Sequence, residues 1–167
     1  NIAKEYDTPD WSPDQAQTEM EQAITAVGKD KIIGVYAAND GTGGGAIAAM
    51  KGAGFTKLPP VTGQDAELAA IQRILAGEQA MTVYKAIKPE ADIAAQMAID
   101  AATGTKYDAT PTTNVNNGSK DVPSVLLNPV AVTTDNVKDT VIKDQFYTVN
   151  QVCTAPYAEA CKAAGTR

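Results

Sequence analysis

Hydrophobic residues along the chain follow two spacings in turn, and the alternation predicts strands separated by helices. The strand-like runs are short, rich in apolar and β-branched residues and bounded by turn residues. They span residues 2–6, 31–38, 58–62, 81–84 and 122–132. The run at 31–38 is apolar enough to be buried on both faces. The last run contains Pro123 and Pro129 and belongs at sheet edges or bends, since proline cannot donate a ladder hydrogen bond.

Between these runs, apolar residues three and four positions apart predict amphipathic helices. The helices are expected at residues 13–27, around 46–52, at 66–76 and at 89–103, and each is followed by a glycine. Ser12 is the expected N-cap of the first helix and Pro13 its first residue. Lys106 to Ser119 is rich in Thr, Asn and Gly and is expected to be a loop. The fold class is therefore α/β, a doubly wound, mostly parallel sheet flanked by helices.

Composition limits the classes of function. The 167 residues suffice for one domain with a hydrophobic core, and 14 basic against 20 acidic residues give a net charge of −6. An acidic chain without a basic, aromatic-rich stretch is not expected to bind nucleic acid. No apolar run approaches the ~20 residues that span a bilayer.

The two cysteines, Cys153 and Cys161, lie close to the end of the chain. Eight helical steps would separate their Cα atoms by ~12 Å, and a disulfide requires less than ~7 Å. A bond becomes feasible if Cys153 precedes a helix that begins near Pro156. We expect this disulfide and an oxidising compartment, with two free thiols as the alternative. Without any histidine, no metal site is expected.

Polar side chains follow the predicted strands at the point where each strand ends. Trp11, Asn39, Asp65 and Lys85 stand in these positions. Ligands of open α/β sheets bind beyond the carboxyl ends of the strands, so these residues are expected to share one rim. The amide, the carboxylate and the ammonium group suit the hydroxyls of a neutral polyol, and the indole face suits the apolar side of a sugar ring.

Each of these residues also has a purely structural interpretation. Trp11 would then be a core residue, Lys85 a solvated strand end, and Asp65 the cap of the following helix. For Asp40, which follows Asn39, an N-cap role is preferred over ligand binding. With no histidine, no activated Ser or Cys and no suitable carboxylate pair, the set predicts binding rather than catalysis, and no cofactor.

The run Gly41 to Ala46 offers a competing hypothesis. It satisfies the G-x-G-x-x-A pattern of a dinucleotide-binding turn between a strand and a helix. That pattern belongs in the first βα turn of its fold, however, and here a helix and a strand precede it. Glycines also occur in such turns simply to allow a bend and close packing.

The same residues carry a resemblance to a known family. The segments Asp10–Pro13, Ala37–Thr42, Val61–Ile74, Met81–Lys85 and Pro123–Leu127 resemble the type I periplasmic sugar-binding proteins, particularly the xylose-binding proteins of bacterial ABC importers. In that family two lobes close on a monosaccharide. The resemblance implies that Trp11 stacks on the sugar ring and that Asn39, Asp65 and Lys85 bind its hydroxyls.

The resemblance further implies reversible binding of D-xylose or a related pentose or hexose, delivery to an ABC permease, and a periplasmic or extracellular location, with a lipid anchor at the N-terminus as one option. Residues 1–167 correspond to the C-terminal lobe, so we expect an N-terminal lobe to be missing. The helix at 89–104 would pack on that lobe, or on a second copy of the chain. The effector domain of a sugar-responsive transcription repressor is an alternative with the same fold.

Overall fold

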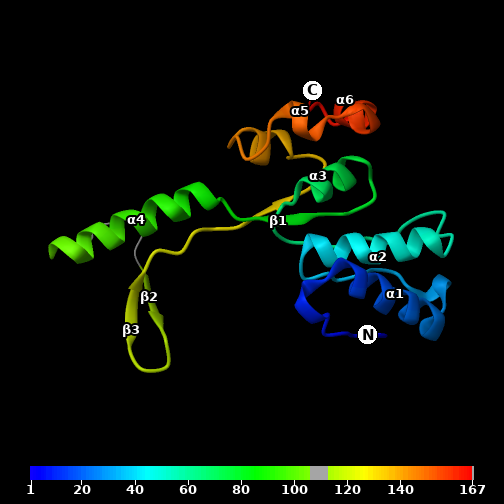
Figure 1. Cartoon of the computed structure of the whole chain (residues 1–167), viewed down its shortest axis with the longest axis horizontal. Coiled ribbons are helices and arrows are strands. Elements are labelled where there is room, and N and C mark those ends of the chain that lie inside the picture. Colours follow the sequence, from blue (N-terminus) through cyan, green and yellow to red (C-terminus); the bar gives the residue numbers. More distant parts are fainter. Residues whose placement is uncertain (106–112, 167) are drawn as a thin grey trace. The chain divides into compact units, whose positions relative to one another are not determined.

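The computed structural model describes residues 1–105 and 113–166 (Figure 1). The chain forms two compact units, of which the first contains Asn1–Tyr84 with Val130–Arg167 and the second contains Lys85–Pro129. Of the loop expected at Lys106 to Ser119, residues 106–112 lie outside the described part. None of the helices in the described part is long and apolar enough to cross a membrane.

The first unit is built on extended segments that pair side by side. Val35 pairs in parallel with Val61, and Gln64 pairs in parallel with Val83. The strand β1 (Thr82–Tyr84) also pairs with β4 (Val130–Val132), in the antiparallel direction. The parallel order expected for the runs at 31–38, 58–62 and 81–84 is therefore confirmed, and β4 adds an antiparallel neighbour directly after Pro129.

The runs at 2–6 and 31–38 differ from the strands that the sequence predicts. Residues 2–6 form no strand, because no described segment pairs with their backbone. The run at 31–38 forms only the bridge at Val35, and it is not buried on both faces: Ile33 is 87% exposed and Tyr36 86%. Its apolar content predicted a central strand, but within the described residues a neighbour is present on one edge only.

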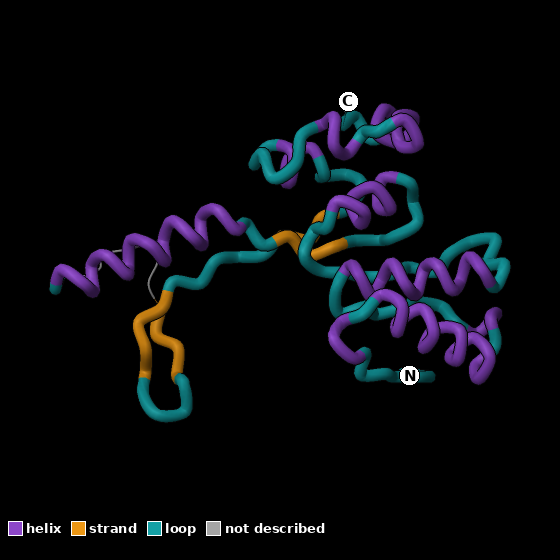
Figure 2. The backbone as a smooth tube through the Cα atoms, in the orientation of Figure 1, coloured by secondary structure: helices purple, strands orange, loops and turns teal. Residues whose placement is uncertain are grey.

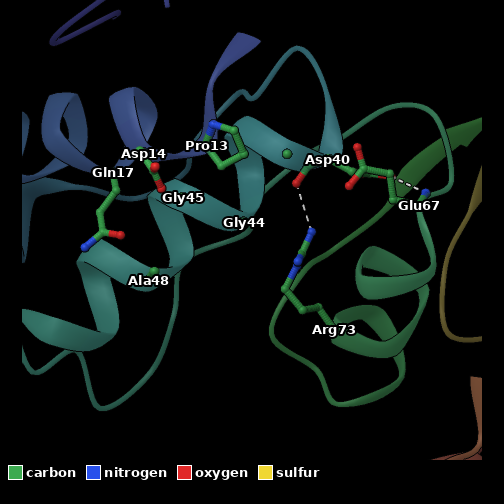
Figure 3. A pocket seen from close by; sticks show the side chains of 10 residues that line it. Pro13, Asp14, Gln17, Asp40, Gly44, Gly45, Ala48, Glu67 and Arg73 are labelled. Carbon is green, nitrogen blue, oxygen red and sulfur yellow. Dashed lines mark hydrogen bonds between the residues drawn. The ribbon is translucent and has the colours of Figure 1, made fainter.

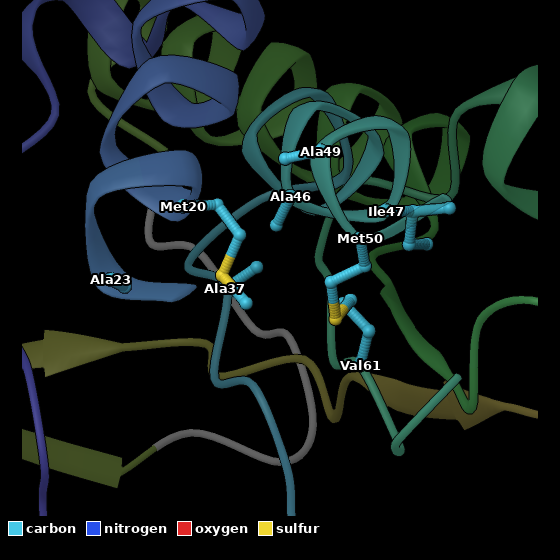
Figure 4. Packing of buried hydrophobic residues seen from close by; sticks show 8 residues of the cluster. All are labelled: Met20, Ala23, Ala37, Ala46, Ile47, Ala49, Met50 and Val61. Carbon is cyan, nitrogen blue, oxygen red and sulfur yellow. The ribbon is translucent and has the colours of Figure 1, made fainter. Parts of the chain in front are cut away.

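Helices α1 (Pro13–Val27) and α2 (Asp40–Gly52) pack against each other and against the extended segments (Figure 2). As expected, the Ser12 side chain accepts a hydrogen bond from the Gln15 amide and Gly28 ends α1. Figure 4 shows the core that these elements share. Its buried members are Met20, Ala23, Ala37, Ala46, Ile47, Ala49, Met50 and Val61.

Helix α3 (Leu68–Leu75) begins two residues later than the pattern indicates, and its residues contact the short helix α5 (Val149–Val152). The Gln72 amide donates to the carbonyls of Gln151 and Val152, at 3.3 and 3.2 Å. Helix α6 (Ala158–Ala163) follows a short 3-10 turn at Ala155–Tyr157, which contains Pro156. Cys153 and Cys161 form the expected disulfide across this turn, with their Cα atoms 5.8 Å apart.

The second unit contains α4 (Ile87–Thr103) and a hairpin of β2 (Thr113–Asn116) and β3 (Asp121–Ser124). The expectation of a loop up to Ser119 is wrong for β2. A turn at Asn117–Gly118 joins the two strands. The side-chain oxygens of Asn116 and Asn117 accept hydrogen bonds from the backbone amides of Gly118 and Ser119. No residue of α4 is buried.

Candidate functional site

Trp11 lies on a short loop immediately before α1. Asp10 and Trp11 both adopt left-handed backbone conformations, with φ of 53° and 57°. Thr8 anchors the loop to α1 through a 2.7 Å hydrogen bond from its hydroxyl to the Glu19 carboxylate. The Trp11 side chain is 57% exposed, so it is not a core residue of this unit.

Asn39 occupies the start of α2 and is its N-cap. Its side-chain oxygen accepts hydrogen bonds from the Thr42 amide, at 2.9 Å, and from the Thr42 hydroxyl, at 2.7 Å. Because a backbone N–H can only donate, these bonds identify the oxygen of the amide group. The nitrogen of this amide, which carries two N–H donors, takes no part in these two bonds.

Asp65 stands at the end of the neighbouring segment. The Asp40 amide donates to the Gln64 carbonyl at 2.9 Å, and the Asp65 amide donates to the Val83 carbonyl at 2.9 Å. These bonds hold the ends of the paired segments, where Asn39 and Asp65 stand, side by side. Asp65 and Ala66 both have positive φ, 96° and 52°. Each such residue costs about 1–3 kcal/mol, so the surrounding structure must hold this turn.

The starts of α1 and α2 also meet. A side-chain carbon added at Gly41, in the first turn of α2, would lie 3.3 Å from the ring of Pro13, the first residue of α1. Pro13 follows Trp11 by two residues. The structure thus brings the segments of Trp11, Asn39 and Asp65 together in the first unit. Lys85 directly follows β1 in sequence and is the first residue of the second unit.

Asp40 is not the N-cap that the sequence favoured. It is the first residue of α2, and its carboxylate is completely buried. It accepts hydrogen bonds from the Thr82 hydroxyl, the Gln79 amide and the Glu67 backbone. Burial raises its pKa, and these donors, together with Arg73, oppose the rise. The prediction failed because the donors come from residues 27 to 42 positions away, which local pattern cannot reveal.

A groove of about 290 Å³ lies beside this carboxylate, where α1 and α2 begin (Figure 3). Arg73 lines the groove and donates to the Asp40 carbonyl at 2.9 Å. Glu67 also lines it, with a pKa raised by burial and by the Asp40 charge. The groove does not include the four candidate residues. Within the described ranges, no group of three or more His, Cys, Asp or Glu side chains is arranged to hold a metal ion.

The glycine run has a packing role in this structure. Gly41 to Gly45 lie inside α2 rather than in a loop before it. A side-chain carbon at Gly45 would stand 2.1 Å from the Pro13 carbonyl oxygen, so only glycine lets α1 approach this closely. The Thr42 amide, near the helix start, is already bonded to Asn39. These contacts explain the glycines without a dinucleotide.

The fold is the α/β fold of the type I periplasmic binding proteins. The chain belongs to that family: the family model described as a periplasmic binding protein domain matches residues 1–106.

Two relatives are named D-xylose-binding periplasmic protein. The one from Escherichia coli is 49% identical over 137 residues, which cover 82% of this chain and 41% of the relative. The one from Haemophilus influenzae is 44% identical over 142 residues, covering 85% and 42%. The chain therefore spans about two fifths of the length of these relatives. Both relatives are named as binding proteins and not as enzymes.

Solved structures agree in fold. An ABC transporter solute-binding protein from Clostridium phytofermentans, with bound β-D-glucose, matches with a TM-score of 0.74 and 31% identity over 85% of this chain and 44% of that one. A carbohydrate transporter solute-binding protein from Chloroflexus aurantiacus, in complex with D-glucose, gives 0.72 and 34% over 85% and 42%.

Proposed function

We propose that this chain binds a monosaccharide reversibly, with D-xylose or a related pentose or hexose as ligand, for delivery to the permease of an ABC importer. The observation that carries the proposal is the rim on which the segments of Trp11, Asn39 and Asp65 meet. The relatives named for D-xylose and the neighbours solved with D-glucose support the same ligand class.

The roles of the four residues follow from their chemistry. Trp11 is exposed and supplies an apolar face for the C–H side of the ring. Asn39 donates through its nitrogen to a hydroxyl oxygen, because its own oxygen is engaged in the cap. The Asp65 carboxylate accepts from hydroxyls and the Lys85 ammonium donates to one. A set with both donors and acceptors matches a neutral ligand whose hydroxyls do both.

We propose further that the chain works as one lobe of a two-lobed protein in the periplasm or outside the cell. The length of the relatives supports this proposal, since the chain covers about two fifths of them. The second lobe would contact the opposite side of the sugar. A sugar affinity measured on this chain alone is then expected to be weaker than in the two-lobed protein.

The test is calorimetric titration with D-xylose and D-glucose. Trp11→Ala removes the stacking face, and burial of an aromatic side chain contributes about 2–3 kcal/mol, so affinity should fall by about 100-fold. Tyr36→Ala, at an aromatic residue that is 86% exposed, is the matched control and should leave affinity unchanged. Unchanged affinity in Trp11→Ala would refute the assignment of this residue.

The alternatives are tested with the same material. A dinucleotide-binding domain would be stabilised by NAD in a thermal-shift assay and not by pentoses. The effector domain of a transcription repressor would also bind sugar, but it would require a DNA-binding segment in the complete gene product. Sequencing upstream of the codon for Asn1 distinguishes that case from a transport protein.

A further inference from the structure

The buried carboxylate of Asp40 joins the segments that carry the candidate ligand residues. One of its oxygens accepts from the Glu67 backbone N–H at 2.9 Å and from the Thr82 hydroxyl at 2.8 Å. The other accepts from the Gln79 side-chain amide at 2.8 Å. Glu67 is two residues after Asp65, Thr82 is three residues before Lys85, and Asp40 itself follows Asn39. The side chain of Asp40 thus connects residues that lie close in sequence to three of the candidates, Asn39, Asp65 and Lys85.

The side chain of Asp40 is completely buried and is closely approached by its neighbours. A side-chain carbon at Gly63 would lie 2.0 Å from one carboxylate oxygen and 2.5 Å from the Gln79 nitrogen. The backbone of Asp40 is engaged as well, since its N–H donates to Gln64 and its carbonyl accepts from Arg73, both at 2.9 Å. Arg73 in turn donates to the Gln79 oxygen at 2.9 Å. Asp40 therefore cannot reach a ligand, and its effect must pass through its neighbours.

The side chain of Asp40 acts as an acceptor in all three of its hydrogen bonds. The Glu67 amide and the Gln79 nitrogen can only donate. The Thr82 oxygen accepts from the Ala66 amide at 3.1 Å, and its hydroxyl donates to Asp40 at 2.8 Å. Three donors thus converge on two oxygens, an arrangement that a neutral amide in place of Asp40 cannot satisfy.

These bonds act on the turn that presents Asp65. Asp65 and Ala66 have positive φ without being glycines, and such conformations persist only when neighbouring groups hold them. The next two amides are held by this network: that of Ala66 by Thr82, and that of Glu67 by Asp40. Without the carboxylate, the turn can relax toward ordinary backbone angles, and the Asp65 side chain would then point elsewhere.

We propose that Asp40 is a positioning residue of the sugar site, which fixes the Asp65–Glu67 turn and the start of α2 in the geometry that binds the ligand. This inference rests on the proposed function for its role in binding. The holding of the turn by Asp40 is a property of the structure that can be measured without any sugar.

The experiment compares Asp40→Asn and Thr82→Val with the core variant Ile47→Val, which weakens packing in the α1–α2 cluster and touches none of these bonds. Amide hydrogen exchange is followed residue by residue, and D-xylose and D-glucose affinities are measured by calorimetry well below the unfolding midpoints. Thr82→Val preserves side-chain shape and serves if Asp40→Asn does not fold.

We expect the amides of Ala66 and Glu67 to exchange at least tenfold faster in Thr82→Val and Asp40→Asn, while the amides of α2 beyond its first turn change no more than in Ile47→Val. Sugar affinity should fall at least tenfold in both variants and remain unchanged in Ile47→Val. A uniform rise in exchange along the chain, or an affinity loss no larger than that of Ile47→Val, would overturn the positioning role. If the unsubstituted chain binds neither sugar, the proposed function fails, and the exchange pattern still decides whether Asp40 holds the turn.

Discussion

The side chain of Asn39 serves helix α2 through its oxygen and, as proposed, a sugar through its nitrogen. Substitution with aspartate separates these uses. Aspartate is as good an N-cap as asparagine, so the unfolding free energy of Asn39→Asp should stay within about 0.5 kcal/mol of the original. The two N–H donors are lost, however, and a sugar hydroxyl oxygen would face a carboxylate. Affinity in calorimetric titration should fall at least tenfold, because a charged acceptor replaces a donor.

Asn39→Ala gives the complementary result. It removes the cap and should cost about 1 kcal/mol of stability, or about 2–4 °C in the unfolding midpoint of a chain of this size. If Asn39→Asp retained full sugar affinity, the nitrogen of Asn39 would have no role in the site.

Glu67, which lines the groove beside Asp40, makes the stability of the folded chain depend on pH. Burial, reinforced by the Asp40 and Asp65 charges and opposed by Arg73, raises its pKa above the ordinary value of 4.5. The folded chain then binds this proton more tightly than the unfolded chain. The contribution of Glu67 to stability is present below pH 4.5 and is lost as the pH rises through the raised value.

Glu67→Gln does not undergo this loss. Relative to the original chain, its unfolding free energy should therefore increase between pH 4 and pH 7. The increase should be less than about 1 kcal/mol, because the side chain is only partly buried and water screens its charge. Urea unfolding at the two pH values measures the difference. A difference that stays constant or decreases with pH would contradict the assignment.

At the scale of elements, the close approach of α1 and α2 depends on Gly45. An alanine there would place its side-chain carbon 2.1 Å from the Pro13 carbonyl oxygen, so the helices must move apart. Such overpacking costs about 1–3 kcal/mol. Gly52→Ala, at the end of the same helix with no atom within 4 Å of the added carbon, is the matched control. It should be neutral or stabilising by up to about 1 kcal/mol. Equal unfolding midpoints for the two variants would show that α1 and α2 can move apart at little cost in stability.

The elements also show how far sequence pattern reaches. The amphipathic stripe and Ser12–Pro13 predicted α1 correctly, because capping and periodicity are local properties. The spacing of Cys153 and Cys161 around Pro156 predicted their disulfide. The run at 31–38 was misjudged, since burial depends on neighbours that the run itself does not specify.

The candidate site, too, could be derived only in part from the sequence. Strand-end positions selected Trp11, Asn39, Asp65 and Lys85, and whether they bind sugar remains a prediction. The role of Asp40 was missed because its donors are distant in sequence. A buried acidic residue at a helix start has the same local signal as an N-cap, so only the tertiary contacts distinguish them.

At the scale of the whole molecule, α4 is expected from the sequence to pack on a part of the protein beyond this chain. Within the described residues none of its side chains is buried, including the apolar side chains of Ile93, Met97 and Ala101, which stand four positions apart. The double substitution Ile93→Glu and Met97→Glu should therefore change the unfolding free energy of the chain by less than about 0.5 kcal/mol. Met50→Ala, at a completely buried residue of α2, should cost about 2–5 kcal/mol and is the contrasting case. Both are measured by urea unfolding, with sedimentation equilibrium on the same samples.

If the chain associates with a second copy through α4, the double substitution should abolish the association, since two charges would enter an apolar contact. A loss of stability comparable to that of Met50→Ala in a monomeric chain would show that α4 is already covered within the chain itself.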